Sequence, residues 1–412
     1  MQRLEELDLP EFDHTDPGLG GEAWHQRIGE ISREHWLARS PLATVVLDRA
    51  AAEAVLRSKA AKFPGREVAD LFGISSGPLR EEIDRNIINI NGPDHQRLRS
   101  LVAPHFSPRA AERHREEIAA LFDSILEPLI DRDEVEAVED LCKPYASQAI
   151  SSLIGGSKDD AERLHDWSLW VQRQFDPVAL ANDLETLDRK AAELQSWVRE
   201  LLHSKRAAPG EDLSSALLEI EEGGDRLDET EVENLIINVI LGGIDTTQSQ
   251  LAHTIRLLAD SPEVWSDLAD STTSASVVEE SLRFEPVTPF TARLLTEDLE
   301  LNDVLFPAGT LLLVCSFTGN RDPEAFTTPS EFRPGGATER RSGRILTFGA
   351  GIHYCLGANL ARVELEEAVR IMRSKLSRIE PLPGEEFGNV SGIYSMERLP
   401  VRLFRGSGND PE

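Results

Sequence analysis

The stretch FGAGIHYCLG, residues 348–357, places one cysteine, Cys355, in a loop of small residues. Residues 349–351 are glycine, alanine and glycine, and an apolar, helix-like segment follows from Leu356. A thiolate there would lie at a helix N-terminus, where uncovered backbone N–H groups stabilise negative charge. The stretch therefore predicts a metal-ligating cysteine, although a single cysteine is more often a small buried apolar residue. The choice between the two interpretations depends on the other motifs of the chain.

The chain has 412 residues and is strongly acidic, with 43 Lys and Arg against 73 Asp and Glu and a net charge of -30. This length allows a core that encloses a cofactor, and two domains are the default expectation. The acidity disfavours nucleic acid and anionic membranes as partners. No stretch approaches the ~20 apolar residues of a membrane span, and no secretory signal is apparent. Three scattered cysteines predict no disulfide framework and fit a reducing cytoplasm.

Helical periodicity dominates the sequence. Residues 110–202 are almost continuously helical in pattern, and residues 229–260 form a long, apolar helix of the kind that runs through a core. Shorter helices are expected from the N-cap Asp48 and near residues 213–220, 262–268 and 274–286. Residues 65–91 are irregular in pattern and predict a long functional loop. Residues 1–22 predict a loose leader and residues 406–412 a disordered tail.

Strands are few, short and near the two ends of the chain. The expected strand segments are residues 35–40 with 43–47, 290–301, 310–317 after a hairpin turn at 307–309, and 399–404. The fold class is therefore mainly α with minor β.

The middle of the long helix combines poor helix formers at its most apolar point, namely Gly242, Gly243, Asp245, Thr246 and Thr247. Paired glycines and a threonine hydroxyl can open the helical ladder and make a groove for a small ligand or water. Equally, such a glycine pair can mark a close helix crossing. An acid beside an alcohol also suits proton delivery.

Two charged pairs have helical spacing. His95 and Arg99 lie at i and i+4, which usually marks a solvated face but can present two hydrogen-bond donors. Glu280 and Arg283 lie at i and i+3; exposed pairs of this kind contribute only ~0–1 kcal/mol, whereas a buried pair would be a structural clamp.

In this order, the His95 motif (HxxxR), the GGIDTT of residues 242–247, the Glu280 motif (ExxR) and the cysteine stretch resemble the cytochrome P450 family. TGNRDP at residues 318–323 agrees, and the resemblance covers residues 35–404. It implies one triangular, mostly helical domain, residues 23–405, that encloses heme b.

The resemblance also implies roles for individual residues. Cys355 matches the proximal thiolate ligand of heme iron, which favours O–O cleavage. Asp245 and Thr246 match the acid that relays protons and the alcohol that hydrogen-bonds dioxygen, the co-substrate. Glu280 and Arg283 match a structural clamp. His95, Arg99, Arg293 and His353 match positions that bind the heme propionates. Phe348 would pack beside the sulfur and limit the access of water, and Gly357 is a further cofactor-binding position.

The third clamp residue departs from the family pattern. The family usually has Arg or His before the Phe of a PxxF stretch, whereas Glu331 precedes Phe332 here. Arg333 or another nearby arginine would have to substitute.

The implied substrate pocket is mostly apolar, which predicts a small to medium hydrophobic substrate such as a terpenoid, steroid, fatty acid or aromatic. Asn238, about two helical turns before Thr246, either hydrogen-bonds the substrate or bonds a helix carbonyl or water. The pocket is lined by residues 65–91, by residues near Tyr394, and by Asn238, Val239, Leu241, Gly242, Val287, Pro289, Phe290 and Ile393.

We expect no fused electron-transfer domain, so the resemblance implies a ferredoxin and its reductase, with NAD(P)H as the indirect electron source, and a monomeric enzyme. Docking of an acidic carrier predicts a basic patch that includes Arg97, Arg109, Arg113 and Arg362. Two alternatives remain: a peroxygenase, which typically lacks the acid–alcohol pair, and a heme-thiolate sensor without turnover.

Overall fold

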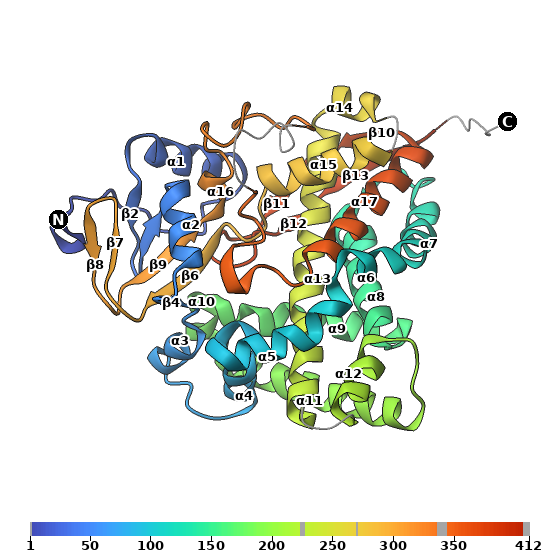
Figure 1. Cartoon of the computed structure of the whole chain (residues 1–412). Coiled ribbons are helices and arrows are strands. Elements are labelled where there is room, and N and C mark those ends of the chain that lie inside the picture. The colour runs from blue at the N-terminus through green and yellow to red at the C-terminus, as the bar shows by residue number, and fades with distance from the viewer. Residues whose placement is uncertain (1, 223–226, 269–270, 336–343, 407–412) are drawn as a thin grey trace. The chain divides into compact units, whose positions relative to one another are not determined.

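A computed structural model describes residues 2–222, 227–268, 271–335 and 344–406 of the chain (Figure 1). These residues form two compact units. Unit 1 comprises Met1–Pro64, Ser249–Cys355 and Arg373–Glu412, and unit 2 comprises Gly65–Gln248 and Leu356–Met372. Helices dominate and the strands are short, which confirms the predicted mainly α class with minor β. Of the predicted tail, only Gly406 lies among the described residues.

Unit 2 is almost entirely helical, and the periodic pattern of residues 110–202 is confirmed. Its α-helices are α3 (Gly65–Leu71), α4 (Pro78–Arg85), α5 (Gly92–Val102), α6 (Pro108–Arg113), α7 (Arg115–Leu126), α8 (Lys143–Ile154), α9 (Ala161–Gln172), α10 (Pro177–Asn182), α11 (Leu184–Ala207) and α12 (Leu213–Glu222). Shorter elements are η2 (Ile87–Asn89), η3 (Ala103–Phe106), η4 (Glu127–Leu129), β5 (Val135–Glu136), the π-helix η5 (Val138–Cys142), η6 (Lys158–Asp160) and η7 (Arg173–Phe175).

Local sequence explains where several of these helices start and stop. The Asp176 carboxylate accepts the amide of Val178 at 3.0 Å and caps α10, whose first residue is Pro177. Gly155 ends α8 with φ of 78°, a left-handed conformation that favours glycine.

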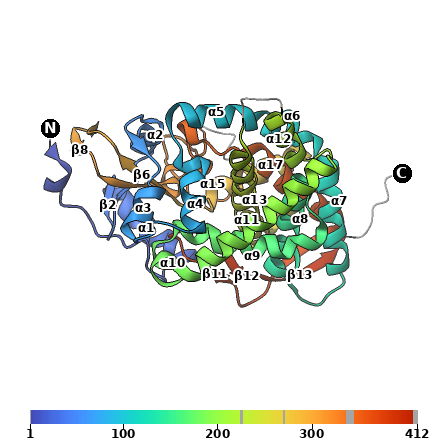
Figure 2. The ribbon, with the colours of Figure 1, turned by 90° about the horizontal axis from the view of Figure 1, so that it is seen from below.

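The segment of residues 65–91 is not the irregular loop that we expected, because it contains α3, α4 and η2. Helix α11 packs on α4 and α9 (Figure 2) and fixes this segment with two hydrogen bonds. The Asp188 carboxylate accepts the amide of Leu79 at 3.0 Å, and Gln195 donates to the carbonyl of Pro78 at 2.9 Å. The helical state of α4 therefore depends on contacts with residues more than a hundred positions later.

Unit 1 combines the sheets with a smaller set of helices. Its early elements are β1 (Gln2–Arg3), η1 (Leu4–Glu6), α1 (Gly21–Glu34), β2 (Leu37–Arg39), β3 (Thr44–Val46), α2 (Arg49–Arg57) and β4 (Ala61–Lys62). The later ones are α14 (Pro262–Asp267), α15 (Ser271–Phe284), β6 (Phe290–Leu295), β7 (Leu299–Leu301), β8 (Val304–Phe306), β9 (Leu311–Cys315), α16 (Ser316–Gly319), η8 (Gly351–His353), β10 (Leu376–Pro381), β11 (Glu386–Phe387), β12 (Met396–Arg398) and β13 (Pro400–Arg405).

Two helices continue from one unit into the other. Helix α13 (Glu229–Ala259) belongs to unit 2 up to Gln248 and to unit 1 from Ser249. Helix α17 (Ala358–Lys375) belongs to unit 2 up to Met372.

The main sheet of unit 1 has the strand order β2-β3-β9-β6-β4, with β3 and β9 parallel and the other pairs antiparallel. Residues 35–40 and 43–47, which we expected to form strands, contain β2 and β3, and these pair as a hairpin. The turn at residues 307–309 is not a hairpin, however, because β8 pairs with β7 in a second sheet while β9 pairs with β6. The β7–β8 turn is instead at Asn302 and Asp303, both with positive φ.

Residues 2–22 are not the loose leader that we expected. Gln2 pairs with Val304 as strand β1 beside β8, and Phe12 is buried in the core of unit 1. Helix α1 then begins at Gly21 and buries Trp24 against Phe317, with ring centroids 5.0 Å apart. The prediction was wrong because the composition of this segment is mostly polar and turn-rich, whereas its order depends on a few apolar residues whose partners lie far along the chain.

Candidate active site

The cysteine loop in unit 1 is held in shape by its own backbone. The amide of Cys355 donates to the carbonyl of Phe348 at 2.9 Å, and the amide of Tyr354 donates to that of Gly351 at 3.2 Å. Gly351 has φ of 73°, and a Cβ there would lie 2.4 Å from the carbonyl oxygen of Leu56. Glycine is therefore required, and the loop presents Cys355 as an exposed thiol.

The Glu280–Arg283 pair is the buried clamp that the sequence left open. Both side chains are 0% exposed, and they form a bidentate pair with distances of 2.7 and 2.8 Å. A charge pair without solvent needs every polar atom satisfied, since an uncompensated buried charge destabilises strongly.

The third clamp position is filled by backbone groups. The guanidinium of Arg283 also donates to the carbonyls of Pro329 at 2.9 Å and Glu331 at 2.8 Å. The amide of Arg333 donates to Glu280 at 2.8 Å. Arg333 thus contacts the clamp through its main-chain amide and not through the arginine side chain that the substitution would require.

The clamp connects to the cysteine loop through Asn320. Arg283 donates to the carbonyl of Asn320 at 3.0 Å. The Asn320 side chain accepts the amide of Leu346 at 2.6 Å and donates to the hydroxyl of Thr347 at 2.9 Å. Thr347 directly precedes the FGAGIHYCLG stretch, so the clamp orients the start of the cysteine loop.

The surroundings of Arg293 on β6 indicate whether unit 1 suits a cofactor that carries carboxylates. Its side chain is buried, and burial lowers the pKa of the guanidinium to about 10. Its hydrogen bond within the described residues goes to the neighbouring carbonyl of Ala292 at 2.8 Å, and none of their carboxylates pairs with it. A buried cation without an anion fits a propionate, and with the exposed Cys355 thiol, unit 1 fits heme. His353 lies in the same loop as Cys355, in η8.

The remaining predicted cofactor residues belong to unit 2. His95 and Arg99 lie one turn apart on α5, as expected from the HxxxR spacing. His95 is 2% exposed, and burial together with the charge of Arg99 lowers the pKa of its ring. A buried imidazole beside a guanidinium is a suitable donor pair for a carboxylate. Gly357, just before α17, has open space around its Cα.

The two glycines of α13 have different surroundings. A Cβ on Gly243 would lie 2.4 Å from Cδ1 of Ile150 on α8, so Gly243 permits a close helix crossing. A Cβ on Gly242 would meet nothing within 4 Å. The packing interpretation therefore holds for Gly243, while Gly242 leaves one face of α13 open, although the helix continues through this point without interruption.

The acid and the alcohol that follow on α13 differ in exposure. Asp245 is buried, and burial raises the pKa of its carboxyl to about 6. The Thr246 hydroxyl donates to the carbonyl of Gly242 at 2.6 Å. An acid that titrates near neutral pH can take up and release protons at physiological pH.

Asn238, Gly242 and Thr246 lie at i, i+4 and i+8 and therefore share one face of α13. The side-chain oxygen of Asn238 accepts the amide of Ile87 at 2.8 Å, a partner that the sequence did not suggest. Its Nδ2 atom is buried and has no hydrogen-bond partner among the described residues. Leu241, three residues after Asn238, is buried.

Sequence reasoning missed a buried acid beside this site. Glu364 on α17 accepts the hydroxyl of Thr247 at 3.1 Å, and its main-chain carbonyl accepts the phenol of Tyr145 at 2.9 Å. Burial raises the pKa of Glu364 to about 8. The signal for Glu364 in the sequence was an acidic residue between the apolar residues Val363 and Leu365 of a helical stretch.

The predicted pocket residues of unit 1 divide into two groups. The amide of Tyr394 donates to the carbonyl of Val287 at 2.8 Å, which brings Ile393 beside the segment of Val287 and Pro289. The ring of Phe290 instead packs in the core, with its centroid 5.5 Å from that of Trp24.

The described residues include no helix that is long and apolar enough to cross a membrane. The family model described as cytochrome P450 matches residues 22–273 and 265–374.

Two curated relatives are similar over most of the chain. Luteothin monooxygenase of Streptomyces thioluteus is 30% identical over 404 residues, which cover 96% of each chain. Cyclomarin C epoxidase CymV of Salinispora arenicola is 35% identical over 300 residues, 72% of this chain and 74% of the relative.

Solved structures are similar over nearly the whole chain. The crystal structure of CalO2 has a TM-score of 0.88 at 27% identity and covers 97% of this chain and 100% of its own. A mutant of P450 EryK in complex with erythromycin B has a TM-score of 0.81 at 28% identity and covers 96% of this chain and 100% of its own.

Proposed function

The chain belongs to the cytochrome P450 family of monooxygenases, and we propose that it hydroxylates or epoxidises a hydrophobic small molecule. One oxygen atom of dioxygen enters the substrate, and the other leaves as water after the uptake of two electrons and two protons. The relatives' names include a monooxygenase and an epoxidase, which supports both outcomes.

Heme b, when bound, supplies the iron that activates dioxygen, and a thiolate ligand favours O–O cleavage. Cys355 would hold the iron, because its loop is held in shape by its own backbone and presents the sulfur. Arg293 and His353 of unit 1, and His95 and Arg99 of unit 2, would bind the propionates. The clamp of Glu280 and Arg283 contacts the loop through Asn320 and would keep the sulfur in place.

Asp245 and Thr246 would deliver protons. Asp245 can exchange protons near neutral pH because burial raises its pKa to about 6. The hydroxyl proton of Thr246 goes to Gly242, which leaves the lone pairs of Oγ1 to accept a proton-bearing group on the open face of α13.

Asn238 would donate a hydrogen bond to an acceptor on the substrate. Its oxygen is committed to Ile87, so the free Nδ2 can only donate. Asn238 precedes Thr246 by eight residues, which corresponds to about 12 Å along a helix. The substrate would therefore carry an acceptor, such as a carbonyl or ether oxygen, remote from the oxidised position.

Comparing Asn238→Leu with Asn238→Asp tests this role, because the aspartate keeps the acceptor for Ile87 and removes the donor. Both variants should weaken substrate binding by about tenfold. Unchanged dissociation constants in both would remove Asn238 from the substrate site.

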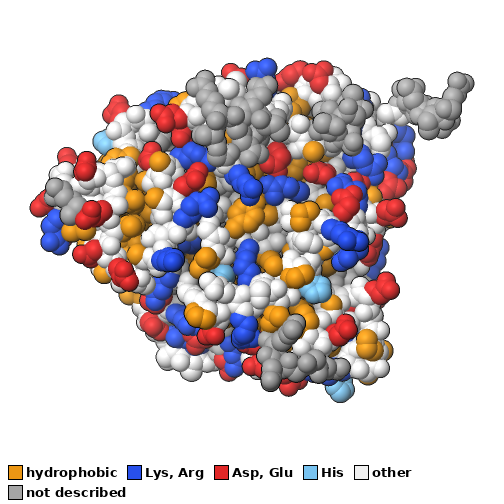
Figure 3. All heavy atoms as spheres, viewed as in Figure 1, with side chains coloured by type: hydrophobic (Ala, Val, Ile, Leu, Met, Phe, Trp, Pro, Cys, Tyr) orange, Lys and Arg blue, Asp and Glu red, His pale blue; other side chains and the backbone are white. Residues whose placement is uncertain are grey.

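Electrons would come from NAD(P)H through a ferredoxin reductase and a ferredoxin. Figure 3 shows Lys and Arg side chains interspersed with Asp and Glu over the face that it presents. Of the proposed basic patch, Arg97 pairs with Glu231, and Arg362 donates to the carbonyl of Ala358. Arg109 and Arg113 are exposed and are the better candidates for contact with an acidic carrier.

The proposal rests on one observation: an exposed cysteine in a glycine loop that a buried clamp orients. The test is turnover of heme-loaded enzyme with ferredoxin, reductase and NADPH on a panel of apolar compounds, using isotopically labelled dioxygen. Label should enter the product, and Asp245→Asn should slow turnover and divert electrons to peroxide. Turnover with hydrogen peroxide alone would instead indicate a peroxygenase, and ligand binding without any product would indicate a sensor.

A further inference from the structure

Tyr394 in unit 1 is fixed at three atoms. Its amide donates to the carbonyl of Val287 at 2.8 Å, its carbonyl contacts Nε2 of His253 at 2.9 Å, and its phenol oxygen accepts the amide of Gly21 at 2.8 Å. The side chain is 0% exposed and stacks on Phe387 with an interplanar angle of 13°. The conformation of the short segment around residue 394 is therefore determined by its neighbours.

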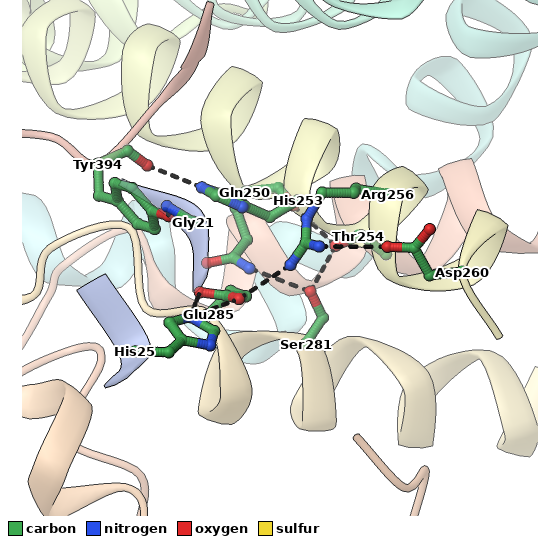
Figure 4. Close-up of polar contacts among 10 residues, drawn as sticks. All are labelled: Gly21, His25, Gln250, His253, Thr254, Arg256, Asp260, Ser281, Glu285 and Tyr394. Carbon is green, nitrogen blue, oxygen red and sulfur yellow. Dashed lines mark hydrogen bonds and ion pairs between the residues drawn. The ribbon is translucent and has the colours of Figure 1, made fainter. Parts of the chain in front are cut away.

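His253 on α13 supplies the only one of these bonds that comes from a side chain to the Tyr394 main chain (Figure 4). A carbonyl can only accept, so Nε2 carries the proton and donates. Nδ1 then has a lone pair, is buried, and has no hydrogen-bond partner among the described residues. Burial lowers the pKa of His253 to about 4, so the ring is neutral near pH 7.

The surroundings keep the imidazole from turning away. The ring of His253 lies 4.8 Å from that of Tyr394 and 6.3 Å from that of Phe387, centroid to centroid. Next to it, Arg256 donates to Glu285 at 3.0 Å, and Glu285 also contacts His25 of α1 (Figure 4).

We propose that His253 is a positioning residue for substrate selectivity, which acts through the Tyr394 carbonyl on the adjacent Ile393. Ile393 is half-buried and stands beside Val287, so a change in the main chain at residue 394 moves a wall of the substrate pocket. This inference rests on the proposed function, because it assumes that Ile393 contacts substrate.

Three variants separate positioning from stability. His253→Leu removes the donor, and His253→Gln restores an amide donor of similar reach. Thr254→Val is the matched control, since it removes a buried hydroxyl that contacts Gln250 at 2.7 Å and Ser281 at 2.7 Å but does not touch Tyr394.

Two azole probes report the pocket without a known substrate. Imidazole needs room only at the iron, whereas 4-phenylimidazole also contacts the side chains that line the pocket. The ratio of their dissociation constants therefore reports how well the pocket accommodates the larger azole. His253→Leu should raise the 4-phenylimidazole constant by about five- to tenfold and leave that of imidazole unchanged. His253→Gln should restore most of the ratio, and Thr254→Val should match the wild type.

Amide hydrogen exchange of the peptide around residue 394 gives a readout that needs neither probe. Exchange should be slow in the wild type, fast in His253→Leu and slow in Thr254→Val. An unchanged azole ratio with unchanged exchange in His253→Leu would overturn the proposal, as would an equal change in Thr254→Val. If His253→Leu does not fold, the wild type provides the test by itself. Fast amide exchange at residue 394 in the wild type would then overturn the proposal. If the proposed function itself is wrong, the result would be different: the azole complexes would not give the spectrum of a thiolate-ligated heme.

Discussion

Replacing each glycine of the α13 pair by alanine should have opposite effects on stability. Both substitutions remove the helix-destabilising flexibility of glycine, which is worth roughly 1 kcal/mol in a helix interior. At Gly242 the new Cβ meets nothing within 4 Å, so Gly242→Ala should stabilise the protein by up to about 1 kcal/mol.

At Gly243 the new Cβ would lie 2.4 Å from Cδ1 and 2.9 Å from Cγ1 of Ile150, which is 2% exposed and has little room to move. Overpacking of this kind costs about 1–3 kcal/mol, which exceeds the helix gain. Gly243→Ala should therefore destabilise by up to about 2 kcal/mol.

The assay is thermal unfolding of the heme-loaded protein followed by far-UV circular dichroism. For a chain of this size, the midpoint shifts by about 1 °C per kcal/mol, so the two variants should differ by about 1–3 °C. Ile150→Val removes Cδ1 and should reduce the penalty of Gly243→Ala in the double variant. Equal midpoints for the two alanine variants, or a penalty that does not depend on residue 150, would refute this account of the helix crossing.

Three further substitutions have defined outcomes. Asn320→Ala leaves the Leu346 amide without its acceptor, so limited proteolysis at the cysteine loop should become faster while far-UV dichroism stays unchanged; equal cleavage rates would contradict the link from clamp to loop. Burial raises the pKa of Glu285, but the hydrogen bond and charge of His25 lower it to about 2, so its stabilisation is present above pH 4.5 and is lost towards pH 2. Glu285→Gln should be less stable at pH 7 and lose less stability on acidification than wild type, as measured by denaturation at each pH. For Glu364 the sign is reversed, because burial raises its pKa from 4.5 to about 8 and its stabilisation is lost as pH rises through that interval. Glu364→Gln should flatten this alkaline decline, and an unchanged pH profile would show that the carboxyl ionises freely in the folded protein.

Much of the fold follows from periodicity and local signals. Asp48 caps α2 by accepting the amide of Ala51 at 2.7 Å, as its position before an alanine-rich run predicted. The helices of residues 110–202 and the central α13 were likewise evident, because each buries a continuous apolar face. Residues 2–22 and 65–91 were not, because their order depends on a few long-range contacts, such as the Gly21 amide on the Tyr394 phenol.

The candidate site was predictable where side chains carry the chemistry. In unit 1, Cys355 is exposed in its loop, whereas Arg293 and the Glu280–Arg283 clamp are buried. The contribution of Glu331 and Arg333 was hidden, because main-chain groups form the contacts and every residue has them. The sequence singled out Asn238 but not its bond to the amide of Ile87, because that bond depends on how residues 65–91 fold.

The central claim is that Cys355 is the thiolate ligand of a heme, and the carbon monoxide difference spectrum of the reduced, heme-loaded protein tests it most directly. The wild type should show the strongly red-shifted Soret band of a thiolate–heme–carbonyl complex. Cys355→His should still bind heme but give the shorter-wavelength band of a histidine-ligated heme. A wild-type spectrum without the red-shifted band, or the same band in Cys355→His, would contradict the account.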